Sequence, residues 1–170
     1  MSESLLWVEK YRPKTIEDCI LPETIKTTLR DVVKQNKIPN MMFTGTSGIG
    51  KTTAARAICN ETKADYLIIN GSDEGRMIDT LRTKLTQFCS TISLSGSRKV
   101  VIIDEADYMN ADSVQPAMRN FTERFADNCS FIFATFSFAV ASIDSFLFLS
   151  SMYVPITLST VILAIRFLLY

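Results

Sequence analysis

The sequence contains no histidine, and its four cysteines are widely spaced without a Cys-x-x-Cys pair. Zinc sites use such residues at short spacing, so we expect no metal chemistry through soft ligands. We interpret the cysteines as small buried apolar side chains in a reducing compartment. They are Cys19, Cys59, Cys89 and Cys129.

An excess of positive charge is also lacking, because the 170 residues contain 18 basic and 18 acidic side chains. Nucleic-acid binding would therefore need a local basic surface. The length suits one domain. Only Asp144 and Arg166 are charged beyond residue 135, so the chain changes character there. The first ten residues carry three charged side chains and no long apolar core, which argues against a signal peptide and predicts a cytoplasmic location.

The run from Gly45 to Thr52 (Gly-Thr-Ser-Gly-Ile-Gly-Lys-Thr) has the composition of a phosphate-binding loop. Its glycines let backbone N–H groups point at an anion, and the helix that follows places its positive end at the same phosphates. We expect Lys51 to reach the terminal phosphates and Thr52 to hold Mg²⁺. The alternative is a flexible Gly/Ser turn without function, but such a turn rarely has a lysine followed by a hydroxyl residue between a strand and a helix.

Strands and helices alternate along the first 135 residues. Trp7 to Pro13 should form an extended arm, because Pro13 disfavours helix at Arg12. Expected strands lie at 41–43, 65–70, 99–104 and 130–135, and expected helices at 22–35, 52–60, around 78–88 and at 113–125, with a polar turn at 95–98. This order predicts an α/β fold with a parallel sheet, helices on both faces and a ligand site at the carboxyl ends of the strands.

The strand at 99–104 ends in two acidic residues, Asp104 and Glu105. Its carboxyl end should lie at the rim where the phosphate loop also lies. We expect Asp104 to hold Mg²⁺ and Glu105 to polarise the water that attacks the terminal phosphate. The alternative is that these acids only cap the next helix.

Five motifs occur in the order found in one family. They are Trp-Val-Glu-Lys-Tyr-Arg-Pro at 7–13, the phosphate loop at 45–52, Asn-Gly-Ser-Asp at 70–73, Asp-Glu-Ala-Asp at 104–107 and Phe-Ile-Phe-Ala-Thr at 131–135. The chain thereby resembles the ATPase subunits of sliding-clamp loaders, both the replication factor C small subunits and the large subunit of T4-like phages. The resemblance implies a P-loop NTPase of the AAA+ type that binds ATP and Mg²⁺.

The resemblance also implies roles for single residues. In relatives the arm lies along adenine and ribose, which implies nucleotide contacts from Val8, Glu9, Lys10, Tyr11 and Ile20. The alternative is that Trp7 and Tyr11 pin the arm to the core. Asn70 stands where related ATPases place a residue that restrains the catalytic glutamate. Phosphate contacts are implied for the loop and its helix, at Gly45, Gly48, Ile49, Gly50, Lys51, Thr52 and Thr53.

Clamp loaders use ATP to open a ring-shaped clamp and load it onto primer-template DNA. The resemblance therefore implies a sliding clamp, other subunits of a hetero-pentameric loader and DNA as partners. Phosphate contacts to DNA would be salt-sensitive and independent of base sequence. Exposed basic residues on helices are more often simply solvated. The residues implied to face DNA are Arg76, Arg82 and Arg119.

The family pattern breaks after Thr135. Relatives place a sensor asparagine at the next position, where this chain has Phe136, and a trans-acting arginine finger about a dozen residues later, where this chain has none. The lid and collar domains of relatives are absent too. We therefore expect an incomplete AAA+ core at 1–135 and an anomalous apolar tail at 136–170.

Three interpretations of this tail stay open. Phe146 to Tyr170 is long and apolar enough for a membrane anchor, although a replication ATPase needs none. Tyr153 to Leu158 could supply a fifth strand. We favour out-of-frame or read-through sequence joined to a truncated gene, because Phe, Leu, Ser and Ile suddenly dominate.

We accordingly expect a clamp-loader ATPase subunit, truncated and weakly hydrolytic, with Lys51 and Glu105 as its catalytic residues. The alternatives are a nonenzymatic fragment that binds clamp or loader subunits, and a related AAA+ helicase loader. The arm motif argues against the helicase loader.

Overall fold

The computed structural model describes residues 7–73, 78–93, 98–110, 113–136 and 163–166. The strands are β1 (Met41–Thr44), β2 (Tyr66–Asn70), β3 (Lys99–Asp104), β4 (Cys129–Thr135) and β5 (Leu163–Arg166). The helices are α1 (Trp7–Lys10), α2 (Glu23–Lys34), α3 (Lys51–Glu61), α4 (Ile78–Ser90), the 3-10 turn η2 (Ala106–Tyr108) and α5 (Val114–Arg124). Strands and helices thus alternate as the sequence predicts.

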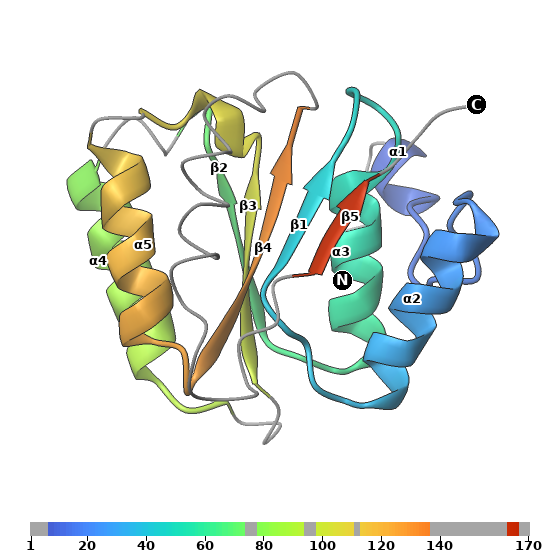
Figure 1. Ribbon diagram of the computed structural model, residues 1–170, viewed down its shortest axis with the longest axis horizontal. Helices are drawn as coiled ribbons and strands as arrows, with labels where there is room; N and C mark the ends of the chain where they lie inside the picture. The colour runs from blue at the N-terminus through green and yellow to red at the C-terminus, as the bar shows by residue number, and fades with distance from the viewer. Residues whose placement is uncertain (1–6, 74–77, 94–97, 111–112, 137–162, 167–170) are drawn as a thin grey trace.

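The five strands form one parallel sheet in the order β2-β3-β4-β1-β5. The register sets Met41 beside Ile132, and Asn70 beside Asp104. Because all strands point the same way, the loop after β1 and the turn after β3 lie at the same end of the sheet (Figure 1). The predicted α/β fold with a parallel sheet is confirmed.

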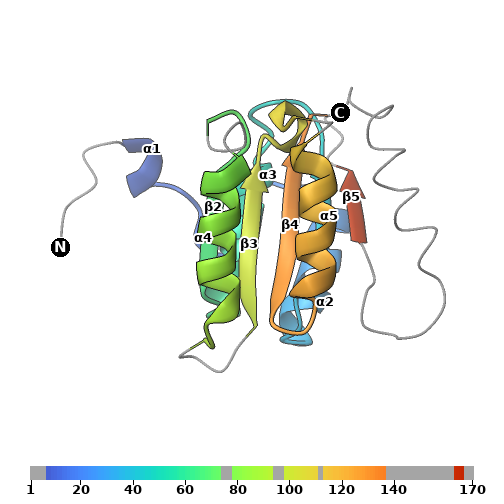
Figure 2. The ribbon, with the colours of Figure 1, turned by 90° about the vertical axis from the view of Figure 1, so that its left-hand side faces the viewer.

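Each face of the sheet is covered by helices, and the side chains of β3 show why. Val100 and Ile102 pack with α2 and α3, whereas Val101 and Ile103 pack with α4 and α5. Successive residues of a strand point to opposite faces, so an uninterrupted apolar run serves two cores. Figure 2 shows α4 and α5 in front of the sheet and α2 and α3 behind it.

The amino-terminal arm differs from the prediction. Trp7–Lys10 form a helical turn closed by the Tyr11 N–H, which donates to the Trp7 carbonyl at 3.0 Å, whereas an extended segment was expected. Arg12 is non-helical, as expected before Pro13. Trp7 is 78% and Tyr11 68% exposed, so these aromatic side chains do not pin the arm to the core, and that alternative is wrong.

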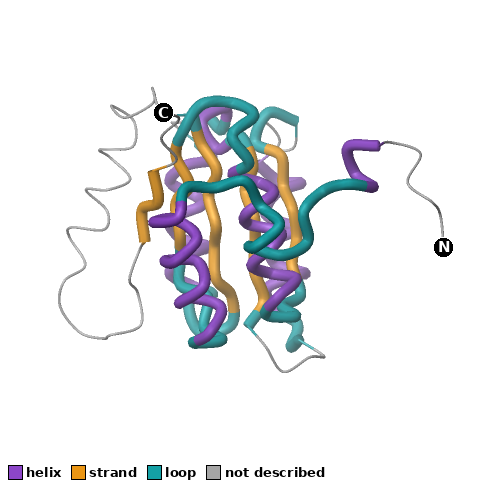
Figure 3. The backbone as a smooth tube through the Cα atoms, turned by 90° about the vertical axis from the view of Figure 1, so that its right-hand side faces the viewer, coloured by secondary structure: helices purple, strands orange, loops and turns teal. Residues whose placement is uncertain are grey.

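The tail contributes one described element. β5 (Leu163–Arg166) pairs with β1 at the sheet edge, as Figure 3 shows from the side of α2 and α3. The chain thus has a fifth strand, while the predicted position at 153–158 lies outside the described residues, as does the polar turn at 95–97. A search of the described residues finds no helix with the length and apolar character needed to span a bilayer.

Candidate nucleotide site

The loop between β1 and α3 is shaped by glycine backbone angles. Gly48 and Gly50 have φ of 81° and 92°, and a Cβ at either position would meet no atom within 4 Å. Left-handed backbone, and not crowding, therefore demands glycine at both sites. Gly50 is the N-cap of α3, and its carbonyl accepts the Ala54 N–H at 2.8 Å. The loop thus delivers the positive end of α3 to the cavity.

Lys51 lies across this loop. Its Nζ donates to the carbonyl oxygens of Gly45 and Thr46, both at 2.8 Å. Burial lowers the pKa of Lys51, while the neighbouring carboxylates of Asp104 and Asp107 act in the opposite direction. A polyanion at Nζ would favour the charged ammonium further. Lys51 is thus held at the mouth of a loop that suits phosphate.

Thr52 and Asp104 form the link between α3 and β3. The Thr52 hydroxyl donates to Asp104 Oδ2 at 2.6 Å. No group of three or more His, Cys, Asp or Glu side chains in the described part of the chain could hold a metal by itself. Mg²⁺ is suited to this arrangement, because it takes one or two protein oxygens and completes its shell with phosphate oxygens and water. The donor pair therefore fits the predicted ion.

The end of β2 is packed tightly against the predicted catalytic base. The Gly71 N–H donates to the Asp104 carbonyl at 2.8 Å, and a Cβ on Gly71 would lie 2.4 Å from the Glu105 carbonyl oxygen. Glu105 itself has left-handed backbone, with φ of 52°, and is exposed. The Asn70 side-chain oxygen accepts from the N–H and hydroxyl of Ser72, at 2.9 and 2.8 Å, and its predicted restraint of Glu105 stays a prediction.

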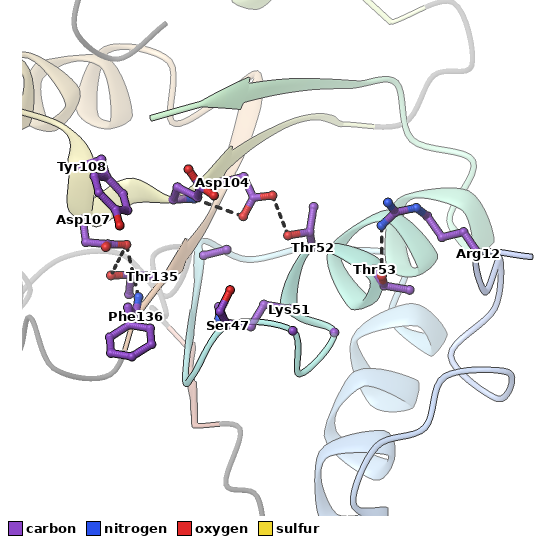
Figure 4. Close-up of a pocket in the computed structure, with 14 residues that line it drawn as sticks. Arg12, Ser47, Lys51, Thr52, Thr53, Asp104, Asp107, Tyr108, Thr135 and Phe136 are labelled. Carbon is purple, nitrogen blue, oxygen red and sulfur yellow. Dashed lines mark hydrogen bonds between the residues drawn. The ribbon is translucent and has the colours of Figure 1, made fainter. Parts of the chain in front are cut away.

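Lys51, Thr52 and Asp104 belong to the lining of a cavity of about 490 Å³. Arg12 and Thr53 lie at one end of it (Figure 4). Asp107 and Phe136 lie at the other end, with Asp104 between the two groups (Figure 4). Of the predicted phosphate, metal and catalytic residues, the lining contains Gly48, Gly50, Lys51, Thr52, Thr53, Asp104 and Glu105.

The sequence interpretation missed several residues at this cavity. Arg12 lines it and donates to the Thr53 hydroxyl at 3.1 Å. Asp107 Oδ1 accepts from the Thr135 hydroxyl at 3.3 Å and from the Phe136 N–H at 3.2 Å. Asp107 belongs to the Asp-Glu-Ala-Asp motif, which can be recognised in the sequence. Its hydrogen bonds to residues at the end of β4 could not be predicted from that motif.

Glu9, Lys10, Tyr11 and Ile20, four of the residues predicted to contact adenine and ribose, do not belong to this lining. Glu9, Lys10 and Tyr11 belong to the arm, and Ile20 is fully exposed. The backbone of Val8 lies in α1. Ile49 is partly buried and packs against the core on the α2 and α3 face. Their nucleotide contacts stay predictions.

The three predicted DNA-facing arginines have different positions. Arg76 lies outside the described residues. Arg82 is exposed on α4, and Arg119 on α5 donates to Glu123 at 3.2 Å. Arg82 and Arg124 line a second cavity of about 480 Å³ between these helices.

The parallel sheet, the glycine loop after β1 and the acids after β3 define a P-loop NTPase. Residues 41–156 match the ATPase family associated with various cellular activities (AAA), which is more than half of the chain. The chain belongs to this family of ATPases.

The predicted resemblance to clamp loaders is confirmed by comparison with curated proteins. The chain is 42% identical over 125 residues to the sliding-clamp-loader large subunit of Enterobacteria phage T4, covering 73% of this chain and 39% of the relative. It is 42% identical over 139 residues to the replication factor C small subunit of Saccharolobus solfataricus, covering 78% and 41%. The chain thus spans about two fifths of the length of these relatives.

Solved structures confirm the fold. A P216G mutant of RuvB from Thermotoga maritima superposes with a TM-score of 0.67, over 94% of this chain and 50% of the other, at 19% identity. At that identity the likeness concerns the fold alone.

Proposed function

We propose that this chain is an ATP-binding subunit of a sliding-clamp loader, in which ATP binding and hydrolysis load the clamp onto primer-template DNA during replication. One observation carries the proposal. Lys51 lies across the phosphate loop, and the Thr52 hydroxyl lies 2.6 Å from the Asp104 carboxylate, in a chain 42% identical to a clamp-loader subunit over its matched region.

The predicted roles follow from these positions. Lys51 would bind the terminal phosphates, and the N-terminus of α3 would add its dipole. Thr52 and Asp104 would hold Mg²⁺, which supplies charge compensation for phosphoryl transfer. Glu105 would orient and polarise the attacking water from the rim of β3.

We further propose that this chain binds ATP but hydrolyses it slowly. Phe136 occupies the position where the resemblance leads us to expect asparagine, and its ring lines the cavity. A phenyl ring can neither donate nor accept the hydrogen bond that would orient water. An arginine finger contributes about 10³-fold or more to turnover in NTPases that use one, and no arginine stands at the expected place.

Residues 136–170 are proposed to be out-of-frame or read-through sequence. Their composition supports this proposal, whereas the family match up to residue 156 and the pairing of β5 with β1 favour a genuine fifth strand. Sequencing the source DNA across codon 135 separates the two. We expect a frameshift or a sequence junction at that codon. An unbroken reading frame, with a product of the full expected size in native cells, would contradict the proposal.

An ATP titration by calorimetry tests the site. Lys51→Ala should weaken binding by at least about 30-fold, as expected when one partner of a charge-assisted contact is removed. Lys37→Ala is the matched control, because Lys37 is exposed and precedes β1, at the opposite end of the sheet from the loop. Equal affinity for the unaltered chain and Lys51→Ala would refute the site.

The cognate clamp, the other loader subunits and primer-template DNA are the proposed partners, and the bacterial cytoplasm the proposed location. Pull-down with clamp and loader subunits, with and without ATP, tests this. ATP-dependent capture and DNA-stimulated phosphate release would support a working loader subunit. ATP-independent capture without turnover would instead favour a nonenzymatic interaction module, an alternative that Phe136 keeps open.

A further inference from the structure

The arm is defined here as residues 7–13. We propose that a set of polar contacts between the arm and α3, the latch, positions the arm beside the bound nucleotide and thereby sets affinity for the adenosine part but not for the triphosphate part. The latch consists of Glu9 and Arg12 from the arm and Thr53 and Arg56 from α3. The inference rests on the proposed ATP site.

The latch joins the arm to the helix that grips phosphate. Arg12 Nη2 and Nε donate to the two carboxylate oxygens of Glu9, at 2.6 and 3.3 Å. Arg12 Nη1 donates to the Thr53 hydroxyl at 3.1 Å, and Arg56 Nη1 donates to Glu9 at 3.3 Å. Thr53 and Arg56 are three residues apart on α3, so they share one helix face. The arm is therefore attached at two points on successive turns.

Among the residues that the structure describes, few other contacts hold the arm. α1 contains four residues, far fewer than an isolated helix needs for stability. Its aromatic side chains Trp7 and Tyr11 contact each other, with ring centroids 6.0 Å apart, but remain exposed. Figures 2 and 3 show α1 standing clear of the sheet and its covering helices. The position of the arm thus depends on the latch.

The charges in the latch compensate one another. Two guanidinium groups, those of Arg12 and Arg56, face the Glu9 carboxylate. The hydrogen bond from Arg12 lowers the pKa of Glu9 below its ordinary value of 4.5, opposed by partial burial. The ion pair is therefore formed at neutral pH and is lost as pH falls through the lowered pKa of Glu9.

The location of the latch identifies which part of the nucleotide it affects. The terminal phosphates belong beside Lys51 and the acids that follow β3. Arg12 and Thr53 lie at the end of the cavity away from Asp107 and Phe136, so a nucleotide held by its phosphates extends its adenosine toward the arm (Figure 4). Glu9, Arg12 and Arg56 thus act as positioning residues.

Binding of two ligands separates this role from a general structural one. Titrations of Mg²⁺–ATP and of inorganic tripolyphosphate are compared for the unaltered chain, Glu9→Gln and Arg56→Gln. Each variant should weaken ATP binding by about fivefold, the upper range for a surface ion pair, and change tripolyphosphate binding by less than about twofold.

Glu17→Gln is the matched control, because Glu17 forms a similar exposed ion pair with Arg30 at 2.5 Å, outside the cavity lining. This variant should change neither affinity. Equal weakening of both ligands by Glu9→Gln, or unchanged ATP affinity, would overturn the latch alone. Failure of the unaltered chain to bind either ligand would overturn the ATP site as well.

Discussion

β3 and β4 are neighbouring parallel strands that end at the same cavity with opposite chemistry. β3 ends in Asp104 and is followed by Glu105, whereas β4 ends in Thr135 and is followed by Phe136. The first pair offers carboxylates, and the second offers a hydroxyl and a ring that is 39% exposed. The proposed magnesium ligand and the proposed catalytic base thus both follow β3, whereas the position expected to hold a sensor asparagine follows β4, so a chain can keep the first two groups and lack the third.

Among changes at the strand ends, removal of the charge at the end of β3 should have the largest effect. Asp104→Asn takes away the carboxylate that accepts from Thr52 and is proposed to hold Mg²⁺. We expect ATP affinity in Mg²⁺ to fall by at least about tenfold, to the affinity measured in chelator. Titrations with and without Mg²⁺ measure this, with exposed Asp79→Asn on α4 as control. Full Mg²⁺ dependence in Asp104→Asn would contradict the assignment.

A larger side chain just after β2, where the chain packs against the end of β3, should have the next largest effect. Gly71→Ala places a methyl group 2.4 Å from the Glu105 carbonyl oxygen, which is backbone and cannot simply rotate away. Overpacking of this kind costs about 1–3 kcal/mol of unfolding free energy. Urea denaturation measures it, with exposed Thr83→Ala as control. A loss no greater than that of Thr83→Ala would show that the contact between β2 and β3 is looser than the structure has it.

A change at the end of β4 should alter turnover and leave binding alone. Phe136→Asn introduces an amide at the edge of the cavity, where the backbone N–H of residue 136 already donates to Asp107 Oδ1. We expect phosphate release to rise a few-fold, well below the roughly 10³-fold that an arginine finger supplies. ATP affinity should stay within about twofold. A fall in affinity with no gain in turnover would break the contrast between the strands.

Treatment with a thiol-alkylating reagent should have the smallest effect, and the four cysteines serve as a control away from the cavity. All four are buried, and burial raises the pKa of Cys59 to about 12. A hydrogen bond from Cys89 lowers the pKa of Cys129, but that thiol is 1% exposed. Thiolate is the reactive form, so alkylation at pH 8 should be slow until the protein unfolds. Rapid labelling of the native protein would place a thiol at the surface.

Local patterns made the centre of the site predictable, and pairings between distant residues made its edges unpredictable. The phosphate loop and Asp104 follow from short motifs after apolar strands, and the two apolar faces of β3 follow from its continuous run of Val and Ile. One of the three interpretations of the tail allowed a fifth strand at 153–158, a segment outside the described residues. The described edge strand is Leu163–Arg166, and its pairing with β1 is a tertiary contact that no local pattern specifies.

The arm shows the same limit. The proline rule correctly keeps Arg12 out of a helix, but the bonds of Arg12 to Thr53 and of Glu9 to Arg56 join residues 41 and 47 positions apart. No local periodicity encodes them. The aromatic residues of the arm suggested anchoring, yet charged groups make its observed contacts.

The most direct test of the central claim measures ATP binding and phosphate release in one preparation of the unaltered chain with Mg²⁺. We predict saturable binding that Lys51→Ala weakens by at least about 30-fold, with phosphate release close to the uncatalysed background. Absence of saturable binding would contradict the nucleotide site, and rapid turnover by the chain alone would contradict the proposed separation of binding from hydrolysis.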